Sequence, residues 1–145
     1  MTIYIPVGTT ASGKTTKCRE WIKNNQPAVL VEADALRTIF FEKYTFDPKL
    51  ENPIRQIMVA CVLNWLDAQY NVAVDDAVFF LSKNDRKYFE DYVQELFGRY
   101  EIIWDFLPIP TDEEVRKRRK GTERGISLDQ WIEIKNRHAM LLEKD

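Results

Sequence analysis

The residue types best suited to chemistry begin near the N-terminus, at residues 8–15 with the sequence GTTASGKT. This segment matches the pattern G-x-x-x-x-G-K-[ST] in full. A loop of such small residues can wrap a phosphate group and direct successive backbone N–H groups at its oxygens. Lys14 would then reach the β- and γ-phosphates of a nucleoside triphosphate, and Thr15 would offer its hydroxyl to Mg²⁺. The spacing therefore predicts a nucleotide-binding loop.

The sequence around this loop supports the prediction. An apolar segment at residues 2–7 precedes the loop, and a helical pattern from Lys14 to about Asn25 follows it. This is the strand–loop–helix context that the motif requires, and the helix start adds a partial positive charge. A glycine-containing turn without a ligand is the alternative, and the context argues against it. The residues expected to bind ATP here are Gly8, Thr9, Thr10, Ala11, Ser12, Gly13, Lys14, Thr15 and Thr16.

The rest of the chain alternates between two kinds of pattern. Apolar segments at 28–31, 72–74 and 100–107 are expected to be buried strands, and helical patterns lie at about 34–43, 53–70, 82–97, 111–120 and 127–142. Strands that alternate with helices predict an α/β fold in three layers, with a parallel sheet of four to five strands and helices on both faces. Three tryptophans are expected in the core of this fold, namely Trp21, Trp65 and Trp131.

An acidic residue and a basic residue follow the second strand. Asp34 comes just after the strand, and Arg37 lies three residues further on. The carboxyl ends of parallel strands face the ligand crevice, so Asp34 should lie across from the γ-phosphate. A carboxylate there can accept the proton of an attacking hydroxyl, and Arg37 can hold an anionic group of the acceptor through two hydrogen bonds. The alternative is a helix N-cap at Asp34 with a solvated Arg37.

The third strand ends in a pair of acids, Asp75 and Asp76. An apolar strand that ends in an acid is typical of an element that holds Mg²⁺ through water or orients the acceptor. Side chains alternate along a strand, and this alternation favours Asp75 for the role. The other interpretation is a polar strand end that only enters a loop.

A strongly basic segment follows the fourth strand. All residues at 116–120 are Lys or Arg, and Arg124 lies close behind them. Prolines before the run and glycines around it provide hinges for a lid at about 108–127. Such a lid can close over a triphosphate and place an arginine on the transferring phosphoryl group. A solvated helix face is the usual interpretation of a charge run.

The composition excludes several classes of protein. The 145 residues suit one domain, taken as 1–145, and the net charge of −2 gives no support to a wholly basic nucleic-acid binder. Cys18 and Cys61 are too few for a disulfide scaffold, and one histidine excludes a His-rich metal site. No apolar run approaches the roughly 20 residues of a membrane span, and no signal-peptide pattern is present. We therefore expect no membrane partner and a cytoplasmic location.

Together these features resemble the kinase domain of bacteriophage polynucleotide 5′-hydroxyl kinase. The loop at 8–15, the Asp34-x-x-Arg37 pair, the strand that ends at Asp75 and the Arg-rich lid occur in the same order and at similar intervals, over nearly the whole chain. The resemblance implies a P-loop kinase fold with the strand order 2-3-1-4. It also implies that Asp34 is the general base and that Arg37 binds the phosphate 3′ to the acceptor nucleotide.

The same resemblance implies that lid arginines contact the donor phosphates. By position this role falls on one or two of four residues, Arg116, Arg118, Arg119 and Arg124, with Arg119 expected at the transferring phosphoryl group. The sequence also departs from the family. The phage kinase has Asp-Thr-Asn after the third strand where this chain has Asp-Asp-Ala at 75–77, and the Asp-x-Asp-Gly-Thr motif of its phosphatase domain is absent. We therefore expect kinase activity alone.

The predicted reaction is in-line transfer of the γ-phosphoryl group of ATP, with Mg²⁺, to the 5′-hydroxyl of RNA or DNA. Phe40 is expected to stack on an acceptor base, although an aromatic helix face that covers the core would show the same pattern. Two alternatives stay open. One is a small-molecule or nucleotide kinase that uses Asp34 and Arg37 on a compact acceptor. The other is a non-catalytic nucleotide-binding module whose nucleotide state controls partner binding.

Overall fold

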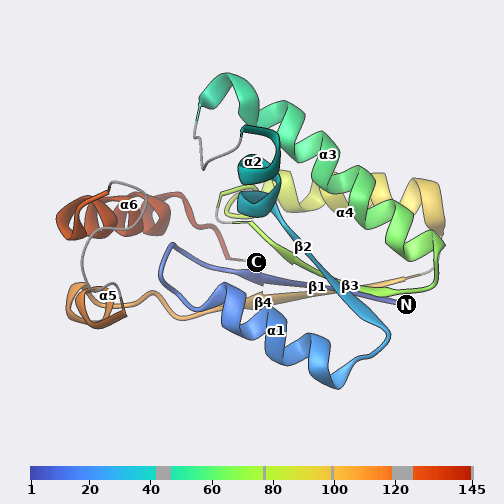
Figure 1. Ribbon diagram of the computed structural model, residues 1–145, viewed down its shortest axis with the longest axis horizontal. Coiled ribbons are helices and arrows are strands. Elements are labelled where there is room, and N and C mark those ends of the chain that lie inside the picture. The colour runs from blue at the N-terminus through green and yellow to red at the C-terminus, as the bar shows by residue number, and fades with distance from the viewer. Residues whose placement is uncertain (42–46, 77, 99, 119–125, 145) are drawn as a thin grey trace.

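The computed structural model describes residues 1–41, 47–76, 78–98, 100–118 and 126–144 (Figure 1). Within them four parallel strands form one sheet, namely β1 (Thr2–Val7), β2 (Ala28–Glu32), β3 (Asn71–Asp75) and β4 (Glu101–Phe106). Their order is β2-β3-β1-β4, with Ile3 of β1 opposite Val72 of β3 and Thr2 opposite Glu101 of β4. The parallel sheet and the strand order expected from the sequence are both confirmed.

Helices cover both faces of this sheet, as Figure 1 shows. Helix α1 (Lys14–Asn24) lies against one face, and α3 (Pro48–Asp67) and α4 (Lys83–Phe97) lie on the other. The short α2 (Ala33–Phe41) follows β2 and contacts α3. Two more helices, α5 (Asp112–Arg118) and α6 (Leu128–Leu141), lie together beyond the carboxyl ends of the strands. The three-layer α/β arrangement is thus confirmed.

The central strand β1 alternates its side chains between two apolar clusters. Ile3, Ile5 and Val7 are buried in the larger cluster, which α3 and α4 also enter. Tyr4 faces the opposite side and packs with Cys18 of α1. A parallel strand that is buried on both faces has a nearly continuous apolar sequence, which is why residues 2–7 carry no charged side chain.

Two helix starts differ from the sequence-based expectations. Helix α3 begins at Pro48 because Asp47 caps it, so Pro53 lies inside the helix and not in its first turn. Helix α2 begins at Ala33, and this places Asp34 in the first turn and not at the N-cap. The N-cap alternative for Asp34 is therefore wrong. An acid in the first turn still complements the partial positive charge of the helix start.

The core expectation is also corrected at one tryptophan. Trp131 is 5% exposed and Trp21 packs against the cluster under α1, but Trp65 is 40% exposed. The buried stripe of α3 runs through Ile54, Met58, Val62 and Leu66, and Trp65 lies beside this stripe. A helix buries only one stripe against the sheet, so an apolar residue next to the stripe stays accessible.

Helices α5 and α6 form one unit, the α5–α6 pair. Each starts with a capping box, which Thr111 and Glu114 form for α5 and Ser127 and Gln130 form for α6. Val115 packs against Trp131 and Ile132 between the two helices. The buried Lys135 donates to Asp112 Oδ1 at 2.6 Å, which adds a charged contact to this apolar one.

The chain after α6 is bonded to the connection between β3 and α4. The Glu143 N–H donates to the carbonyl of Leu81 at 2.9 Å. The guanidinium of Arg86, 2% exposed, donates to the carbonyls of Phe80, Leu81 and Glu143. A buried guanidinium surrounded by carbonyl oxygens holds segments that are distant in sequence. In the described part of the chain, no helix combines the length and the apolar character that a bilayer crossing requires.

Candidate active site

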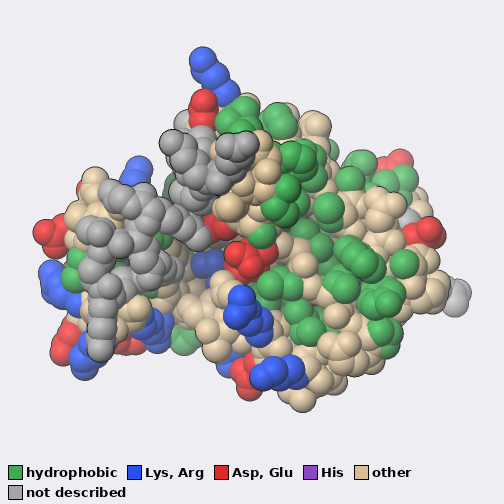
Figure 2. Space-filling view, in the orientation of Figure 1, with side chains coloured by type: hydrophobic (Ala, Val, Ile, Leu, Met, Phe, Trp, Pro, Cys, Tyr) green, Lys and Arg blue, Asp and Glu red, His purple; other side chains and the backbone are tan. Residues whose placement is uncertain are grey.

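A cleft of about 960 Å³ opens at the carboxyl ends of the strands. The loop after β1 and the start of α1 contribute residues Thr10–Lys17 to its lining. The strand ends, α2 and α3 contribute five acids and one arginine, namely Glu32, Asp34, Arg37, Glu51, Asp75 and Asp76. The opposite side consists of Arg118, Ile126, Trp131, Ile134, Arg137, His138 and Leu141. Figure 2 shows acidic side chains next to basic ones at the middle of this face.

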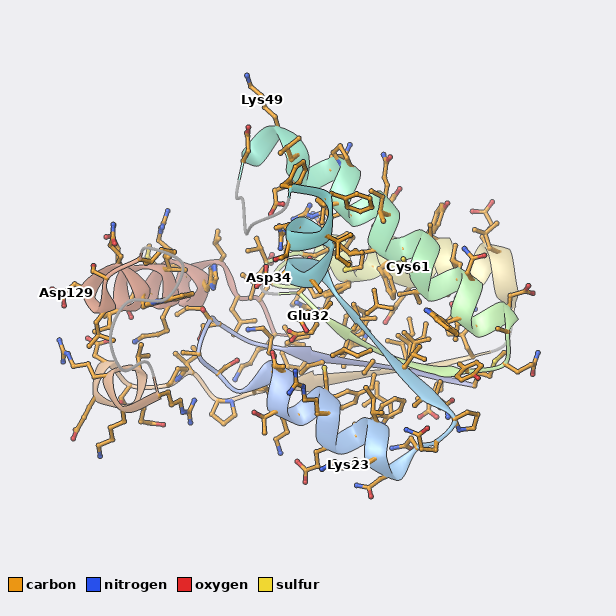
Figure 3. The ribbon with its side chains drawn as sticks, viewed as in Figure 1. Lys23, Glu32, Asp34, Lys49, Cys61 and Asp129 are labelled. Atoms are coloured by element: carbon orange, nitrogen blue, oxygen red, sulfur yellow. The ribbon has the colours of Figure 1, made fainter. Side chains whose placement is uncertain are left out.

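The structure brings the predicted acid and the predicted loop together. Asp34 and Glu32 lie at the same end of the sheet as the first turn of α1 (Figure 3). This is the end at which α/β sheets bind their ligands. Asp75, the last residue of β3, lines the same cleft.

The loop itself has the backbone of an anion site. Gly13 has φ 92° and stands before α1, which starts without a side-chain cap and without an acid in its first turn. The first N–H groups of a helix lack partners within the helix, so an uncapped start can bind an anion. The Ser12 hydroxyl oxygen is buried and has no hydrogen-bond partner among the described residues. A Cβ added at Gly8 would lie 2.6 Å from that oxygen, so the loop is closely packed there. These features fit a nucleotide phosphate.

Lys14 and Thr15 are the two side chains of the loop that would act on this phosphate. Lys14 is 7% exposed, and its Nζ donates to the carbonyls of Gly8 at 3.3 Å and of Thr9 at 2.5 Å. The ammonium group is therefore held against the loop. The Thr15 hydroxyl donates to Asp75 Oδ2 at 2.5 Å. A hydroxyl beside a carboxylate is an oxygen donor set that suits Mg²⁺.

The described residues include no cluster of three or more His, Cys, Asp or Glu side chains that could hold a metal by themselves. Mg²⁺ usually takes one or two protein oxygens and completes its shell with water and substrate phosphates. Thr15 and Asp75 would be those protein ligands. Burial raises the pKa of Asp75, while the Thr15 hydroxyl and the Lys14 charge act in the opposite direction.

The two neighbouring acids face different groups. Asp75 contacts Thr15, and Lys14 acts on its charge. Asp76 is 7% exposed, accepts the backbone N–H of Val78 at 3.3 Å, and is influenced by Arg37 and Arg55. Burial raises the pKa of Asp76 against the charge of Arg37. The contact with the loop favours Asp75 for the metal, which agrees with the alternation argument.

Arg37 is held between two carboxylates. Its Nη1 donates to Asp34 Oδ1 at 2.7 Å, and its Nη2 donates to Glu51 Oε1 at 2.7 Å. The Arg37 Nε donates to Glu51 Oε2 at 3.2 Å, so one edge of the guanidinium is occupied by Glu51. Burial lowers the pKa of Arg37, but the bonds to Glu51 and the charges of Asp76 and Asp34 outweigh burial and raise it. A guanidinium has five N–H donors, and Nη2 makes a second bond to Glu51, to Oε2 at 2.8 Å, so an acceptor anion would use the hydrogen that remains on Nη1.

Of the predicted lid arginines, Arg118 lines the cleft. Its Nη1 donates to the carbonyl of Ala11 in the loop at 2.5 Å. Arg116 lies in the last turn of α5 and is not among the residues that line the cleft. Arg119 and Arg124 lie outside the described residues. Phe40 is 54% exposed on α2 and does not line the cleft, so its contact with an acceptor base stays a prediction.

Sequence reasoning missed two residues of the site. Glu51 lies between the helical patterns expected at 34–43 and 53–70, and no local pattern pairs it with Arg37. His138 is the single histidine, which in the sequence only excludes a His-rich metal site. In the structure its Nδ1 accepts the backbone N–H of Thr10 at 3.0 Å. The signal available for His138 was the helical spacing of residues 131, 134, 138 and 141, which line the cleft together.

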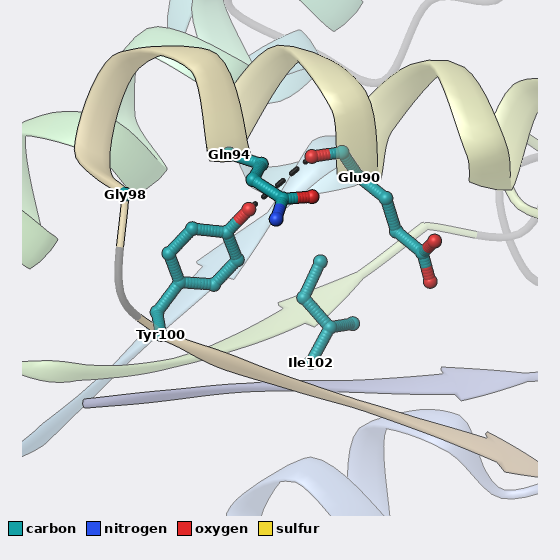
Figure 4. A pocket seen from close by; sticks show the side chains of 5 residues that line it. All are labelled: Glu90, Gln94, Gly98, Tyr100 and Ile102. Carbon is teal, nitrogen blue, oxygen red and sulfur yellow. Dashed lines mark hydrogen bonds between the residues drawn. The ribbon is translucent and has the colours of Figure 1, made fainter.

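A second, shallower pocket of about 170 Å³ lies between α4 and the start of β4 (Figure 4). The Tyr100 hydroxyl donates to the carbonyl of Glu90 at 3.2 Å, and the Glu90 carboxylate accepts the indole N–H of Trp104. The polar groups of Tyr100 and Glu90 are therefore already engaged in hydrogen bonds. We assign no ligand to this pocket.

Comparisons with known proteins were made by sequence and by structure. No protein-family model and no curated protein sequence matches the chain. Among solved structures, a chain of the Pnkp1/Rnl/Hen1 complex matches with a TM-score of 0.63 and 27% identity over 84% of this chain. A chain of the Pnkp1/Rnl/Hen1 RNA repair complex matches with a TM-score of 0.67 and 22% identity over 97% of this chain. The chain has the P-loop kinase fold. The expected resemblance to polynucleotide kinases is thereby confirmed.

Further P-loop kinases have the same fold. A gluconokinase from Sinorhizobium meliloti matches with a TM-score of 0.55 and 15% identity, over 99% of this chain and 75% of the gluconokinase. An APS kinase from Mycobacterium tuberculosis matches with a TM-score of 0.53 and 16% identity, over 99% of this chain and 96% of that kinase. This chain spans 40% and 44% of the length of the two matched chains from the Pnkp1 complexes. The likeness to the gluconokinase and the APS kinase shows the fold alone.

Proposed function

We propose that this P-loop kinase transfers the γ-phosphoryl group of ATP to the 5′-hydroxyl of a polynucleotide. One observation carries the proposal. Asp34 lines the same cleft as the phosphate loop, with its side chain 33% exposed and one oxygen bonded to Arg37. An accessible carboxylate opposite a γ-phosphate can receive a proton from an acceptor alcohol.

Each residue of the cleft has its own role in the proposed reaction. The acceptor hydroxyl attacks the γ-phosphorus and gives its proton to Asp34, while the bond to the β-phosphate oxygen breaks and ADP leaves. Lys14 and the N–H groups at the start of α1 stabilise the negative charge on the phosphate oxygens. Thr15 and Asp75 would hold Mg²⁺, which would neutralise charge on the phosphates.

Two observations support a polynucleotide as the acceptor. The first is the likeness to the Pnkp1 complexes, one of which is described as an RNA repair complex. The second is the buried Arg37, whose Nη1 keeps a hydrogen available for a phosphate next to the hydroxyl that Asp34 would deprotonate. Of the predicted contacts, Phe40 lies one helical turn after Arg37 and has the exposed ring that base stacking requires.

A small-molecule acceptor is the second candidate, and a specific observation favours it. Glu51 already occupies the forked edge of Arg37, and acids outnumber arginines on the acceptor side of the cleft. A polyanion gains less from such a surface than from a basic one. The fold neighbours gluconokinase and APS kinase also fit a compact acceptor by their names.

The deciding experiment offers γ-labelled ATP and Mg²⁺ together with 5′-hydroxyl RNA, 5′-hydroxyl DNA, nucleosides or sugar alcohols in parallel. Matched oligonucleotides that already carry a 5′-phosphate serve as controls, and Lys14→Ala serves as the inactive enzyme. Label on 5′-hydroxyl ends alone supports the proposal. Label on small alcohols alone favours the second candidate. Nucleotide binding without transfer to any acceptor leaves the non-catalytic binding module.

A further inference from the structure

One contact of the phosphate loop has no part in the mechanism above. The backbone N–H of Thr10 donates to His138 Nδ1 at 3.0 Å, across 128 positions of sequence. Both residues are 8% exposed. A buried backbone N–H needs an acceptor, and here a side chain of α6 provides it.

This contact fixes the chemical state of the ring. An imidazole that accepts a hydrogen bond at Nδ1 is neutral and carries its hydrogen on Nε2. Burial and the positive charges of Lys14 and Arg137 lower the pKa of His138 to about 4. The ring is therefore neutral near pH 7, and the acceptor for Thr10 is present under ordinary conditions.

The residue after Thr10 shows why the loop needs support from outside. Ala11 has φ 60°, a left-handed conformation that is unfavourable for a residue with a Cβ. The Ala11 carbonyl accepts a hydrogen bond from Arg118, and the Ala11 side chain packs against the cluster around Val115 and Trp131. The α5–α6 pair thus contacts both Thr10 and Ala11.

We propose that His138 is a positioning residue for the nucleotide, which holds Thr10 and thereby the curvature of the loop that receives the phosphates. Without an acceptor on α6, the loop adopts other conformations that satisfy the Thr10 N–H. A nucleotide then binds only those molecules whose loop has kept the binding conformation. Its apparent affinity is therefore reduced in proportion to the fraction of molecules in that conformation. This inference rests on the proposed function only as far as nucleotide binding.

Two substitutions separate hydrogen bonding from packing. His138→Leu fills similar space and removes the acceptor, whereas the Oδ1 of His138→Asn can accept in place of Nδ1. Met140→Ala, at an 87% exposed position of the same helix, is the control. ADP and a non-hydrolysable ATP analogue are titrated into each protein by calorimetry at pH 7.5. No acceptor substrate is needed.

We expect His138→Leu to raise the Kd for ADP about 10-fold, because it leaves a buried N–H without a partner. His138→Asn should stay within about 3-fold of the wild type, which a loss of helix packing would not allow. In turnover assays His138→Leu should raise KM for ATP more than it lowers kcat.

Equal Kd values for the wild type and His138→Leu would overturn the inference. A His138→Asn variant that binds ADP as weakly as His138→Leu would also overturn it. Normal ADP binding without polynucleotide labelling overturns only the proposed acceptor. A wild type that binds no nucleotide overturns both the proposed function and this inference.

Discussion

Glu51 occupies the forked edge of Arg37, with Nη2–Oε1 at 2.7 Å and Nε–Oε2 at 3.2 Å. The arginine side chain is 7% exposed and the glutamate side chain is 19% exposed. This pair joins α3 to α2, and a second carboxylate, Asp34, shares the same guanidinium. A nearly buried cation with two acidic partners is held in position, and it also holds the acid beside it.

Removal of Glu51 should therefore destabilise the fold. Glu51→Ala leaves Arg37 with Asp34 alone, and we expect a loss of about 2 kcal/mol in the free energy of unfolding, less than for a fully buried pair. Urea unfolding of the wild type and the variant measures the difference. The control is Glu113→Ala on α5, which breaks an ion pair at 3.5 Å between side chains more than 70% exposed. It should change stability by less than about 0.5 kcal/mol. Equal effects of both substitutions would contradict the assignment.

Asp34→Asn should abolish most turnover while it spares nucleotide binding. The amide oxygen can still accept from Arg37, but the side chain no longer takes up a proton. We expect kcat to fall by about 10²–10⁴-fold, with the Kd for ATP nearly unchanged. Asp91→Asn on α4, whose side chain is 62% exposed in an ion pair with Lys87, is the control and should keep full turnover. An Asp34 variant with normal kcat removes this residue from the mechanism.

Gly13→Ala should strain the loop although space is available. A Cβ at this position meets nothing within 4 Å, so the cost is the positive φ of 92° and not a clash. A left-handed residue with a Cβ costs about 1–2 kcal/mol. We expect this loss in thermal or urea unfolding without nucleotide, and weaker binding of ADP. Gly13→Asn should cost less, because asparagine adopts this conformation more readily. An alanine variant as stable as the wild type would show that the loop relaxes freely.

His138 should make stability depend on pH. Its folded pKa of about 4 lies below the ordinary 6.5, so the unfolded chain binds a proton more tightly than the folded one. The contribution of the neutral His138 ring to the free energy of unfolding is fully present above pH 6.5. It is lost as the pH falls toward 4, by up to about 1.4 kcal/mol per pH unit. The folded pKa values of Asp75 and Asp76 are raised, so protonation of these carboxyls in acid favours the folded chain, opposite to the effect of His138. The difference between the wild type and His138→Asn isolates the histidine. If the two curves run parallel from pH 7 to 4.5, the ring is not held neutral.

The sheet and the phosphate loop could be predicted because their signals are local. Strand β1 is a continuous apolar run, and the glycines and Lys14 of the loop stand at fixed spacing directly after it. The capping boxes that begin with Thr111 and Ser127 are also short-range patterns, and they lie at the starts of the helical patterns expected at 111–120 and 127–142. Such features depend on residues within a few positions of one another, which a single sequence displays directly.

The contacts that complete the site could not be predicted in this way. Arg37 meets Glu51 across 14 positions, and Thr10 meets His138 across 128. Both pairs depend on how whole helices lie relative to the sheet. The start of α3 was misjudged because Pro53 is a strong helix-start signal, while the actual cap is Asp47 with Pro48 behind it. Trp65 was misjudged because aromatic composition does not reveal on which side of a buried stripe a residue lies.

The contacts around the cleft form a closed mechanical ring. His138 joins the loop to α6, Glu143 joins the end of α6 to Leu81, and Asp75 joins β3 back to Thr15 at the start of α1. A ring differs from an open chain in how it carries load, because α6 cannot move away from the sheet unless at least one of these bonds breaks. A pull on the backbone at Glu143 would therefore be transmitted to the phosphate loop, although the two lie at opposite ends of the sequence.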